Sequence, residues 1–452
     1  MKTFNRRDFL RTSGAAALFA ATPGLAYSQV VGGGGSFTDY RALVCVFMFG
    51  GNDSYNMLIP NTNAEYAAYA ASRQNLALLQ SDLLPISPAS TGTPDFGLHP
   101  AMGGIQGLFQ AGNAALVTNV GPLVEPTTKD QYFNQSVTLP PQLFSHNDQQ
   151  DQWHSLRGNV PSKTGWAGRM ADLIRNSVAG QQMATNASLS GASLFQSADE
   201  TVAYVMGPNG PIQFEGFSTT PGDILNEQRL AFGRVVDAAY GSVYERGYAE
   251  VQRRAIDAAD TVSAAIANAP TINTVFPQSQ LGTQLRTVAR LIAVRDELQM
   301  QRQVFFVGVG GFDSHDDQEL NQPGLLGGVS DAITAFHAAT VELSIADSVT
   351  TFTQSDFGRT LTSNGDGTDH AWAGNQLIVG GAVNGGDLYG SYPQLTIGGP
   401  EDVGGGRMIP STSSDQYAAT LARWFGIADA DLDIVAPNLA NFAQRDLGFM
   451  IP

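Results

Sequence analysis

The feature that most constrains the fold is an unbroken apolar run at residues 42–49, "ALVCVFMF", which ends in Gly-Gly-Asn-Asp. A strand with one wet face alternates apolar and polar residues, whereas a run without alternation fits a strand covered on both faces. The only cysteine of the sequence, Cys45, lies inside this run, where core packing is its expected role. The run therefore predicts a central strand of a parallel sheet.

Further apolar runs predict more strands, and helical periodicity lies between them. The predicted strands are 114–123, 303–310, 348–359 and 376–383, and the predicted helices include 100–113, 165–178, 224–269, 279–299, 326–345 and 414–427. Strands that alternate with helices indicate one α/β domain, over residues 41–452, with a mostly parallel central sheet. Residues near 188–220 have a weaker pattern of short strands and turns, which predicts an irregular insertion.

The N-terminal 26 residues predict a twin-arginine export signal. The pair Arg6-Arg7 precedes a short apolar stretch over 14–21 and a small-residue segment that ends at Ala26. A glycine-rich linker is expected over 27–40. The twin-arginine translocase is thus an expected partner during export, with a periplasmic or secreted destination. Because no other stretch of about twenty apolar residues occurs, no membrane span is expected in the mature chain.

The charge balance excludes one class of partner. Lys and Arg total 24 against 41 Asp and Glu, a formal net charge of -17. Such a surface repels phosphate backbones, so nucleic acid is not an expected partner. The acidity also suits divalent cations.

Acids and histidines gather where predicted strands end. Asp53, Asp313 with His315, and Asp356 each follow an apolar strand, and Asp369 with His370 comes from the next loop. A further cluster at a strand-to-helix turn supplies Ser145, His146 and Asp148. Ligands gather beyond the carboxyl ends of parallel strands, and carboxylates placed together there repel unless a cation or a proton neutralises them. Mixed Asp and His ligands suit zinc, manganese or iron.

The other three histidines have no such neighbours. His337 lies in a helical pattern, which favours a structural role, and His154 gains no support from its neighbours. His99 is interpreted as capping the helix that follows, with a place in the site as the alternative.

Several motifs in fixed order carry a family resemblance. They are "FMFGGNDSYNMLIP", "LHPAMGGI", "FSHNDQQDQW", "GWAGR", "GGFDSHDDQ", "TQSDFGRT", "NGDGTDHAWAGNQLIVGGAVNGGDLYG" and "DQYAATLARWFG". Together with the export signal, this set resembles the exported bacterial family catalogued as domain of unknown function 1501, which is placed in the alkaline phosphatase and sulfatase superfamily. The resemblance covers about Arg41 to Gly426. It implies a three-layer α/β sandwich and a metal-dependent hydrolase of phosphate or sulfate esters.

The resemblance also implies site residues. The implied metal ligands are Asp53, Asp313, His315, Asp356, Asp369 and His370, which would hold one or two divalent ions, with zinc, manganese and calcium left open. Asp369 is alternatively a hydrogen-bond partner behind the ligands. Phe357 stands where a second histidine ligand is usual, so one metal is an alternative, as is His146 or Asp148 in that position.

The catalytic residues implied are Ser145, His146 and Arg359. Ser145 would be the nucleophile at a helix N-terminus, with Ser54 and Ser314 as fallbacks. Arg359 or Arg157 would clamp an anionic oxygen, with a solvent-facing ion pair as the favoured alternative for either. A cysteine in a Cys-x-Pro-x-Arg context is absent from the sequence, which argues against a formylglycine sulfatase.

Three functions stay open at this point. The first is a hydrolase of small-molecule or polysaccharide phosphate or sulfate esters. The second is a degenerate member that keeps the fold but acts as a non-catalytic binding or envelope-assembly protein. The third is a hydrolase or transferase of a non-ester substrate, such as a modified polysaccharide.

Overall fold

The computed structural model describes residues 37–451 except 94, 213–217 and 219. The signal peptide predicted over 1–26, and most of the linker predicted over 27–40, lie outside the described residues. No helix among the residues described is both long enough and apolar enough to cross a bilayer.

A large mixed sheet runs through the molecule, with strand order β13-β5-β12-β9-β1-β8-β6-β7, and β14 also pairs with β5. All of its pairings are parallel except those of β12 with β5 and β9. Its strands are β1 (Arg41–Met48), β5 (Ala114–Gly121), β6 (Asn186–Ser188), β7 (Tyr204–Val205), β8 (Arg302–Val309), β9 (Val349–Ser355), β12 (Gly374–Gly380), β13 (Leu388–Tyr389) and β14 (Thr412–Ser413).

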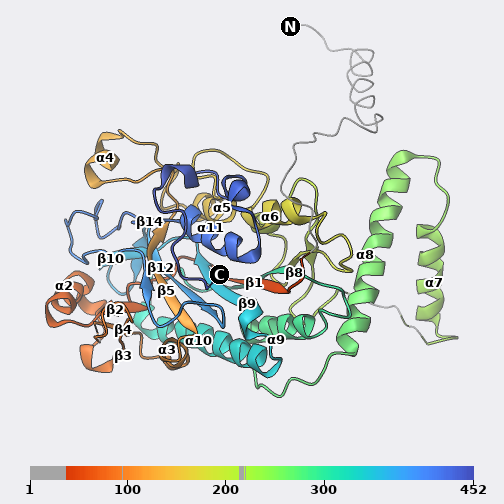
Figure 1. Ribbon diagram of the computed structural model, residues 1–452, viewed down its shortest axis with the longest axis horizontal. Coiled ribbons are helices and arrows are strands. Elements are labelled where there is room, and N and C mark those ends of the chain that lie inside the picture. The colour runs from red at the N-terminus through yellow and green to blue at the C-terminus, as the bar shows by residue number, and fades with distance from the viewer. Residues whose placement is uncertain (1–36, 94, 213–217, 219, 452) are drawn as a thin grey trace, which may run out of the picture. The chain divides into compact units, whose positions relative to one another are not determined.

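Helices cover both faces of this sheet, which confirms the predicted three-layer α/β arrangement. In Figure 1, α3, α9 and α10 lie along one face and α5, α6 and α11 along the other. The helices are α2 (Asn63–Arg73), α3 (Gly103–Gln110), α4 (Lys129–Asn134), α5 (His146–Ser155), α6 (Trp166–Ile174), α7 (Ile224–Val236), α8 (Val243–Ala267), α9 (Gln280–Ala293), α10 (Gln318–Glu342), α11 (Ser414–Phe425) and α12 (Leu432–Val435).

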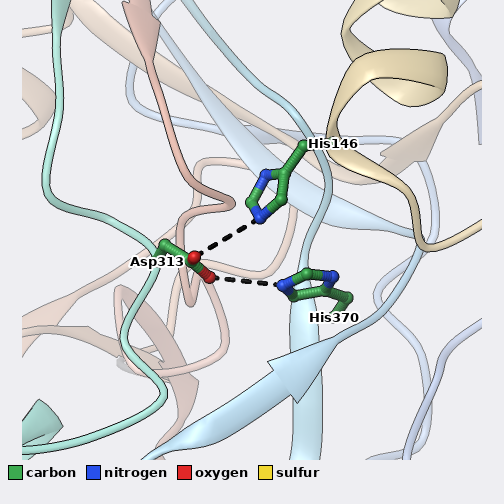
Figure 2. A group of neighbouring side chains, drawn as sticks. All are labelled: His146, Asp313 and His370. Carbon is green, nitrogen blue, oxygen red and sulfur yellow. Dashed lines mark hydrogen bonds and ion pairs between the residues drawn. The ribbon is translucent and has the colours of Figure 1, made fainter.

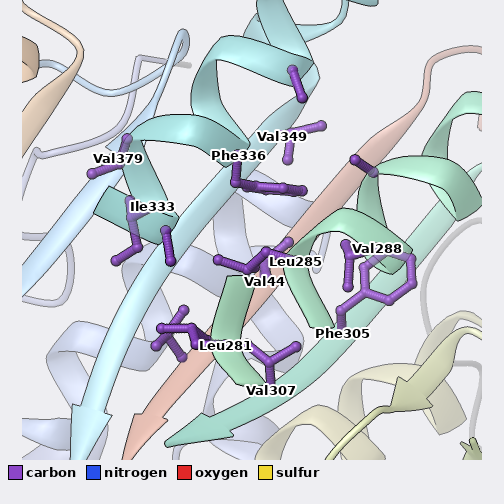
Figure 3. Packing of buried hydrophobic residues seen from close by; sticks show 14 of the residues in the cluster. Val44, Leu281, Leu285, Val288, Phe305, Val307, Ile333, Phe336, Val349 and Val379 are labelled. Atoms are coloured by element: carbon purple, nitrogen blue, oxygen red, sulfur yellow. The ribbon is translucent and has the colours of Figure 1, made fainter. Parts of the chain in front are cut away.

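The side chains of β1 explain why its sequence does not alternate. Val44 and Val46 pack into the core on the α9 and α10 side, whereas Leu43, Cys45 and Phe47 pack into the core on the α6 and α11 side. Figure 3 shows Val44 surrounded by α9 and α10 side chains and by the neighbouring strands. Both faces of the strand exclude water after its first residue, Arg41, so every later position is apolar.

Residues 186–205 overlap the start of the region near 188–220 that was predicted as an insertion of short strands and turns. They supply β6 and β7, which extend the main sheet in parallel beyond β8. These strands have three and two residues, which is too short for a periodic pattern in the sequence.

Two small sheets complete the fold. The first joins β2 (Leu58–Pro60), β3 (Leu84–Ile86) and β4 (Phe96–Leu98), and the second is the hairpin of β10 (Arg359–Ser363) and β11 (Thr368–His370). In the hairpin, Arg359 pairs with His370. This pairing places both residues beside the end of β9.

Candidate metal centre

Three parallel strands end at the same level and define the floor of the site. Met48 of β1 is in register with Val309 of β8 and with Ser355 of β9. The turns after these strands therefore meet, and they carry Asp53, Asp313 and Asp356.

Two glycines after β1 permit this close approach. Gly50 has a φ of 117°, and a Cβ there would lie 2.3 Å from the backbone nitrogen of Asp313. Gly51 has a φ of 88°, and a Cβ there would lie 2.3 Å from the ring of Phe357. Side chains at these positions would push the strand ends apart.

His146, Asp313 and His370 converge, each offering an atom within 4.8 Å of the others' (Figure 2). The Nε2 of His146 is 3.4 Å from one oxygen of Asp313, and the Nε2 of His370 is 3.3 Å from the other. His315 joins them, because its Nε2 is 3.1 Å from Asp313 Oδ1 and 2.8 Å from His370 Nε2. Figure 2 shows His146 at the start of α5, His370 on the hairpin and Asp313 in the turn after β8.

Each of the three histidines has its other ring nitrogen beside an acceptor. Nδ1 of His146 is 2.6 Å from Asp356, Nδ1 of His315 is 3.3 Å from Asp369, and Nδ1 of His370 is 2.9 Å from the carbonyl of Phe144. A carbonyl or carboxylate oxygen can only accept here, so each Nδ1 carries the hydrogen. In the neutral rings Nε2 is then the bare nitrogen, and all three bare nitrogens lie next to Asp313.

This donor set fits a divalent cation. The Nε2 atoms of His315 and His370 are 2.8 Å apart beside a carboxylate, and their lone pairs repel one another unless a positive charge lies between them. In a tetrahedral zinc site with Zn–N of about 2.0–2.1 Å, ligand atoms lie roughly 3.3 Å apart. The contacts among His315, His370 and Asp313 Oδ1, at 2.8, 3.1 and 3.3 Å, are close to that spacing.

Buried carboxylate oxygens give a second sign of a cation. Oδ2 of Asp356 accepts from His146 and Gln150, but its Oδ1, fully buried, has no hydrogen-bond partner among the described residues. The same holds for Oδ1 of Asp53, whose Oδ2 pairs with Arg73. An unpaired buried carboxylate oxygen is costly, and a cation offsets that cost.

The protonation states of Asp313 and His370 favour cation binding. Partial burial raises the pKa of Asp313, but the hydrogen bond and charge of Arg359 outweigh it, and the net result lies below the usual value. Partial burial also lowers the pKa of His370, with smaller contributions from its neighbours. A carboxylate and a neutral imidazole therefore face each other near neutral pH.

The predicted site residues thus separate into groups. The structure brings together Asp313, His315, His370, His146 and Asp356, and it places Asp369 behind His315. Asp53 contacts Arg73 and Gln318 and, among the described residues, forms no hydrogen bond or ion pair with His146, His315 or His370. Its role as a ligand stays a prediction.

Arg359 does not fit the predicted clamp on a substrate oxygen. Its side chain is 0% exposed and donates to Asp313 and Gly50 as well as to both oxygens of Thr368. A fully buried guanidinium cannot touch a substrate, so its observed role is to hold Asp313. The clamp required an exposed Arg359, which the sequence pattern could not establish.

The serine candidates differ in their surroundings. Ser54 and Ser314 are both buried, and their hydroxyls are bonded to the backbone of Asn375 and to Gln318. Ser145 is only partly buried, at the N-cap of α5, and its Oγ donates to Asp148 over 2.6 Å. Ser145 is the candidate with access to solvent.

Phe357 lies against the histidines. Its ring centroid is 4.8 Å from that of His146 and 4.6 Å from that of His370, and the side chain is buried. An apolar ring thus occupies the space beside these two imidazoles.

Sequence reasoning missed the supporting residues Phe144, Gln150, Gln318, Thr368 and Arg73. Phe144 acts through its carbonyl, with a φ of 73°, and the guanidinium of Arg407 lies over its ring and donates to the carbonyl of His370. Nothing in a residue's type signals a backbone acceptor, and the other four are recognised only from their partners.

Comparisons with known proteins give a family and distant structural similarity. The family model described as "Protein of unknown function (DUF1501)" matches residues 40–433. No curated protein matches the sequence. Among solved structures, Ps i-CgsB in complex with k-i-k-neocarrahexaose is 9% identical, with a TM-score of 0.38, over 90% of this chain and 77% of that one. A protein from the metabolism of multiple glycosaminoglycans by Bacteroides thetaiotaomicron is 13% identical, with a TM-score of 0.31, over 87% and 74%. At such values neither similarity bears on activity.

Proposed function

The chain belongs to the DUF1501 family, and we propose that it is an exported, metal-dependent hydrolase of phosphate or sulfate esters, related to the alkaline phosphatase and sulfatase superfamily and located in the periplasm or secreted. The observation that carries the proposal is the convergence of three histidine Nε2 atoms on Asp313.

The residues that would hold the cation are His146, His315, His370 and Asp313. Their Nδ1 partners fix the tautomer and orientation of each ring, as second-shell acceptors do in metalloproteins. Asp356 backs His146 and retains one unpaired oxygen. When bound, a divalent cation supplies positive charge that polarises ester oxygens and shields an anionic substrate.

Ser145 is the proposed nucleophile. Its hydroxyl hydrogen points at Asp148, which accepts the proton while Oγ forms the bond to phosphorus or sulfur and the bond from that atom to the ester oxygen breaks. The departing oxygen takes up a proton, and water then hydrolyses the Ser145 ester, which releases phosphate or sulfate and restores the hydroxyl. The position at the start of the ten-residue helix α5 favours developing negative charge on Oγ. His146, the next residue, contacts Asp313 and Asp356, and these contacts hold the N-terminus of α5 beside the two carboxylates.

A second candidate function is a non-catalytic binding protein that keeps the cation. The observation that favours it is the full burial of Arg359, which removes the cationic side chain expected to bind an anionic ester oxygen.

The test begins with metal analysis of the purified protein, followed by assays with aryl phosphates and aryl sulfates, with and without a chelator. We expect about one cation per chain and a hydrolysis that the chelator abolishes. The Ser145→Ala variant should keep the metal and lose at least about 100-fold in rate. Metal with no turnover of either ester class would favour the binding protein, and a protein that binds no cation would refute both candidates.

A further inference from the structure

A continuous chain of hydrogen bonds links Asp53 to Asp313, which lies beside His146, His315 and His370. It starts at the buried ion pair of Asp53 with Arg73, whose side chains are 1% and 0% exposed. Arg73 also donates to the carbonyl of Thr360 over 2.9 Å, so the pair is held from the hairpin side as well. The pair is neutral overall and cannot move without breaking buried contacts.

The charge of Asp53 sets the direction of the next link. An ionised carboxylate only accepts hydrogen bonds, so Gln318 presents its amide nitrogen to Asp53. Its amide oxygen is then turned the other way, where it accepts from the hydroxyls of Thr368, at 2.6 Å, and Ser314, at 3.1 Å. Gln318 is fully buried, so no water competes for these bonds.

The orientation passes on to Arg359. The hydroxyl hydrogen of Thr368 is committed to Gln318, which leaves its oxygen to accept from Nε of Arg359 over 3.1 Å. Because the guanidinium is a rigid planar fork, fixing Nε also fixes Nη1. Nη1 donates to Oδ1 of Asp313 over 2.7 Å, and this is the oxygen that lies 3.1 and 3.3 Å from the Nε2 atoms of His315 and His370.

From this chain of contacts we propose that Gln318 and Thr368 are positioning residues of the metal centre: they transmit the fixed polarity of the Asp53–Arg73 ion pair to Arg359 and so hold Asp313 Oδ1 where the histidines converge. The inference rests on the proposed function, since it needs a cation at that point. Asp53 was predicted to be a metal ligand, and in this inference it instead acts on the ligand Asp313 indirectly, through hydrogen bonds.

A neighbouring glutamine, Gln322, provides a control that distinguishes a positioning effect on the metal centre from a loss of packing. Gln322 lies one turn further along α10, is also buried, and donates to the backbone carbonyl of Asp53 over 3.0 Å. Its oxygen accepts from Asn56 and, over 3.4 Å, from the amide nitrogen of Gln318, and neither bond leads toward Arg359. Gln322 is therefore a matched control for the loss of a buried amide beside Asp53.

The experiment is a titration of metal-free protein with Co²⁺, read as a dissociation constant and a visible absorption spectrum. We expect Gln318→Leu and Thr368→Val to weaken Co²⁺ binding by about 10-fold or more and to change the spectrum, as loss of second-shell support does. Gln322→Leu, and Thr368→Ser with its retained hydroxyl, should stay within about 2-fold of the wild type. Thermal unfolding of each metal-free variant measures any common loss of packing.

The outcomes distinguish the inference from the proposed function. Wild-type protein that binds no Co²⁺ overturns the metal centre and the inference with it. Wild-type affinity in Gln318→Leu and Thr368→Val overturns the inference alone, as does an equal loss in Gln322→Leu. If Gln318→Leu does not fold, the Co²⁺ affinities of Thr368→Val and Thr368→Ser are compared instead. Equal affinities in these two variants overturn the inference.

Discussion

The six histidines of the sequence form two sets with opposite surroundings. His146, His315 and His370 meet at the carboxyl edge of the sheet, partly exposed, each with Nδ1 beside an acceptor. The other three, His99, His154 and His337, lie buried and apart from this cluster.

The interior set is held by packing. His154 lies between the rings of Phe47 and Phe306, its Nε2 has no partner among the described residues, and burial lowers its pKa to about 3. His99 accepts from the backbone nitrogen of Ala101, but the N-cap of α3 is Met102, without a side-chain hydrogen bond, so the predicted capping of that helix is wrong. Burial lowers the pKa of His99 to about 4. Burial also lowers the pKa of His337.

The difference shows what marks a cation site. A single buried imidazole stays neutral and fills space, because charging it in a dry environment is costly. Several imidazoles whose bare nitrogens meet beside a carboxylate are unfavourable by packing alone, and they need a positive charge. Convergence of lone pairs, and not burial or the number of histidines, separates the two sets.

The largest expected effect is loss of one converging nitrogen. His370→Ala should weaken Zn²⁺ binding by at least about 100-fold, because a ligand and its link between Phe144 and Asp313 both disappear. Competition with a chromogenic chelator measures the affinity. His337→Gln, from the interior set, is the control and should bind Zn²⁺ as the wild type does. Equal affinities in the two variants would erase the distinction between the sets.

A smaller effect is expected from the acceptors behind the rings. Asp356→Asn should reduce Zn²⁺ affinity by about 10- to 100-fold, because the amide no longer favours the hydrogen-bonded imidazole as a carboxylate does. Asp369→Asn should lose less, since this carboxylate is 52% exposed and lies 3.3 Å from His315, against 0% and 2.6 Å for Asp356 and His146. Isothermal titration measures the Zn²⁺ affinity of both variants. A larger loss in Asp369→Asn than in Asp356→Asn would contradict the prediction.

The smallest effect concerns the interior set and pH. The folded-state pKa of His154 is about 3 and its ordinary value 6.5, so the unfolded chain binds the proton first as pH falls. Stability is then lost progressively below about pH 6.5 by up to about 1.4 kcal/mol per pH unit. His154→Phe lacks this group, so between about pH 7 and about pH 5 it should lose up to about 2 kcal/mol less than the wild type. Denaturant unfolding at both pH values measures the difference, and parallel pH dependences would show that His154 is not buried as described.

The local pattern of the sequence predicted most of the fold. The run over 42–49 gave β1 and its burial on both faces, and 414–427 gave α11, which ends at Gly426 with a φ of 113°. Boundaries were less well predicted: the helix expected over 326–345 begins at Gln318, since α10 contains Pro323 and three glycines that obscure its periodicity. The short strands β6 and β7 left no periodic signal at all.

The candidate site was predicted as a set of residues but not as a network. Strand ends located Asp313 and Asp356, because parallel strands of one sheet carry their carboxyl ends to the same edge. The same rule grouped Asp53 with them, but the Arg73 guanidinium pairs with its Oδ2. Arg359 was expected to be exposed, either in a solvent-facing ion pair or as a clamp on a substrate oxygen, and it is buried behind Asp313.

By itself the sequence determined the layered α/β fold, the family and the edge of the sheet at which acids and histidines collect, because these depend on local periodicity and on residue type. Only the tertiary structure decided which carboxylate is neutralised by an arginine, which nitrogen of each imidazole is bare, and how Gln318 connects Asp53 to Asp313. Those properties depend on partners far apart in the chain, such as His146 and Asp356, 210 positions apart. Hydrogen-bond direction and charge compensation arise when such partners meet in the folded chain.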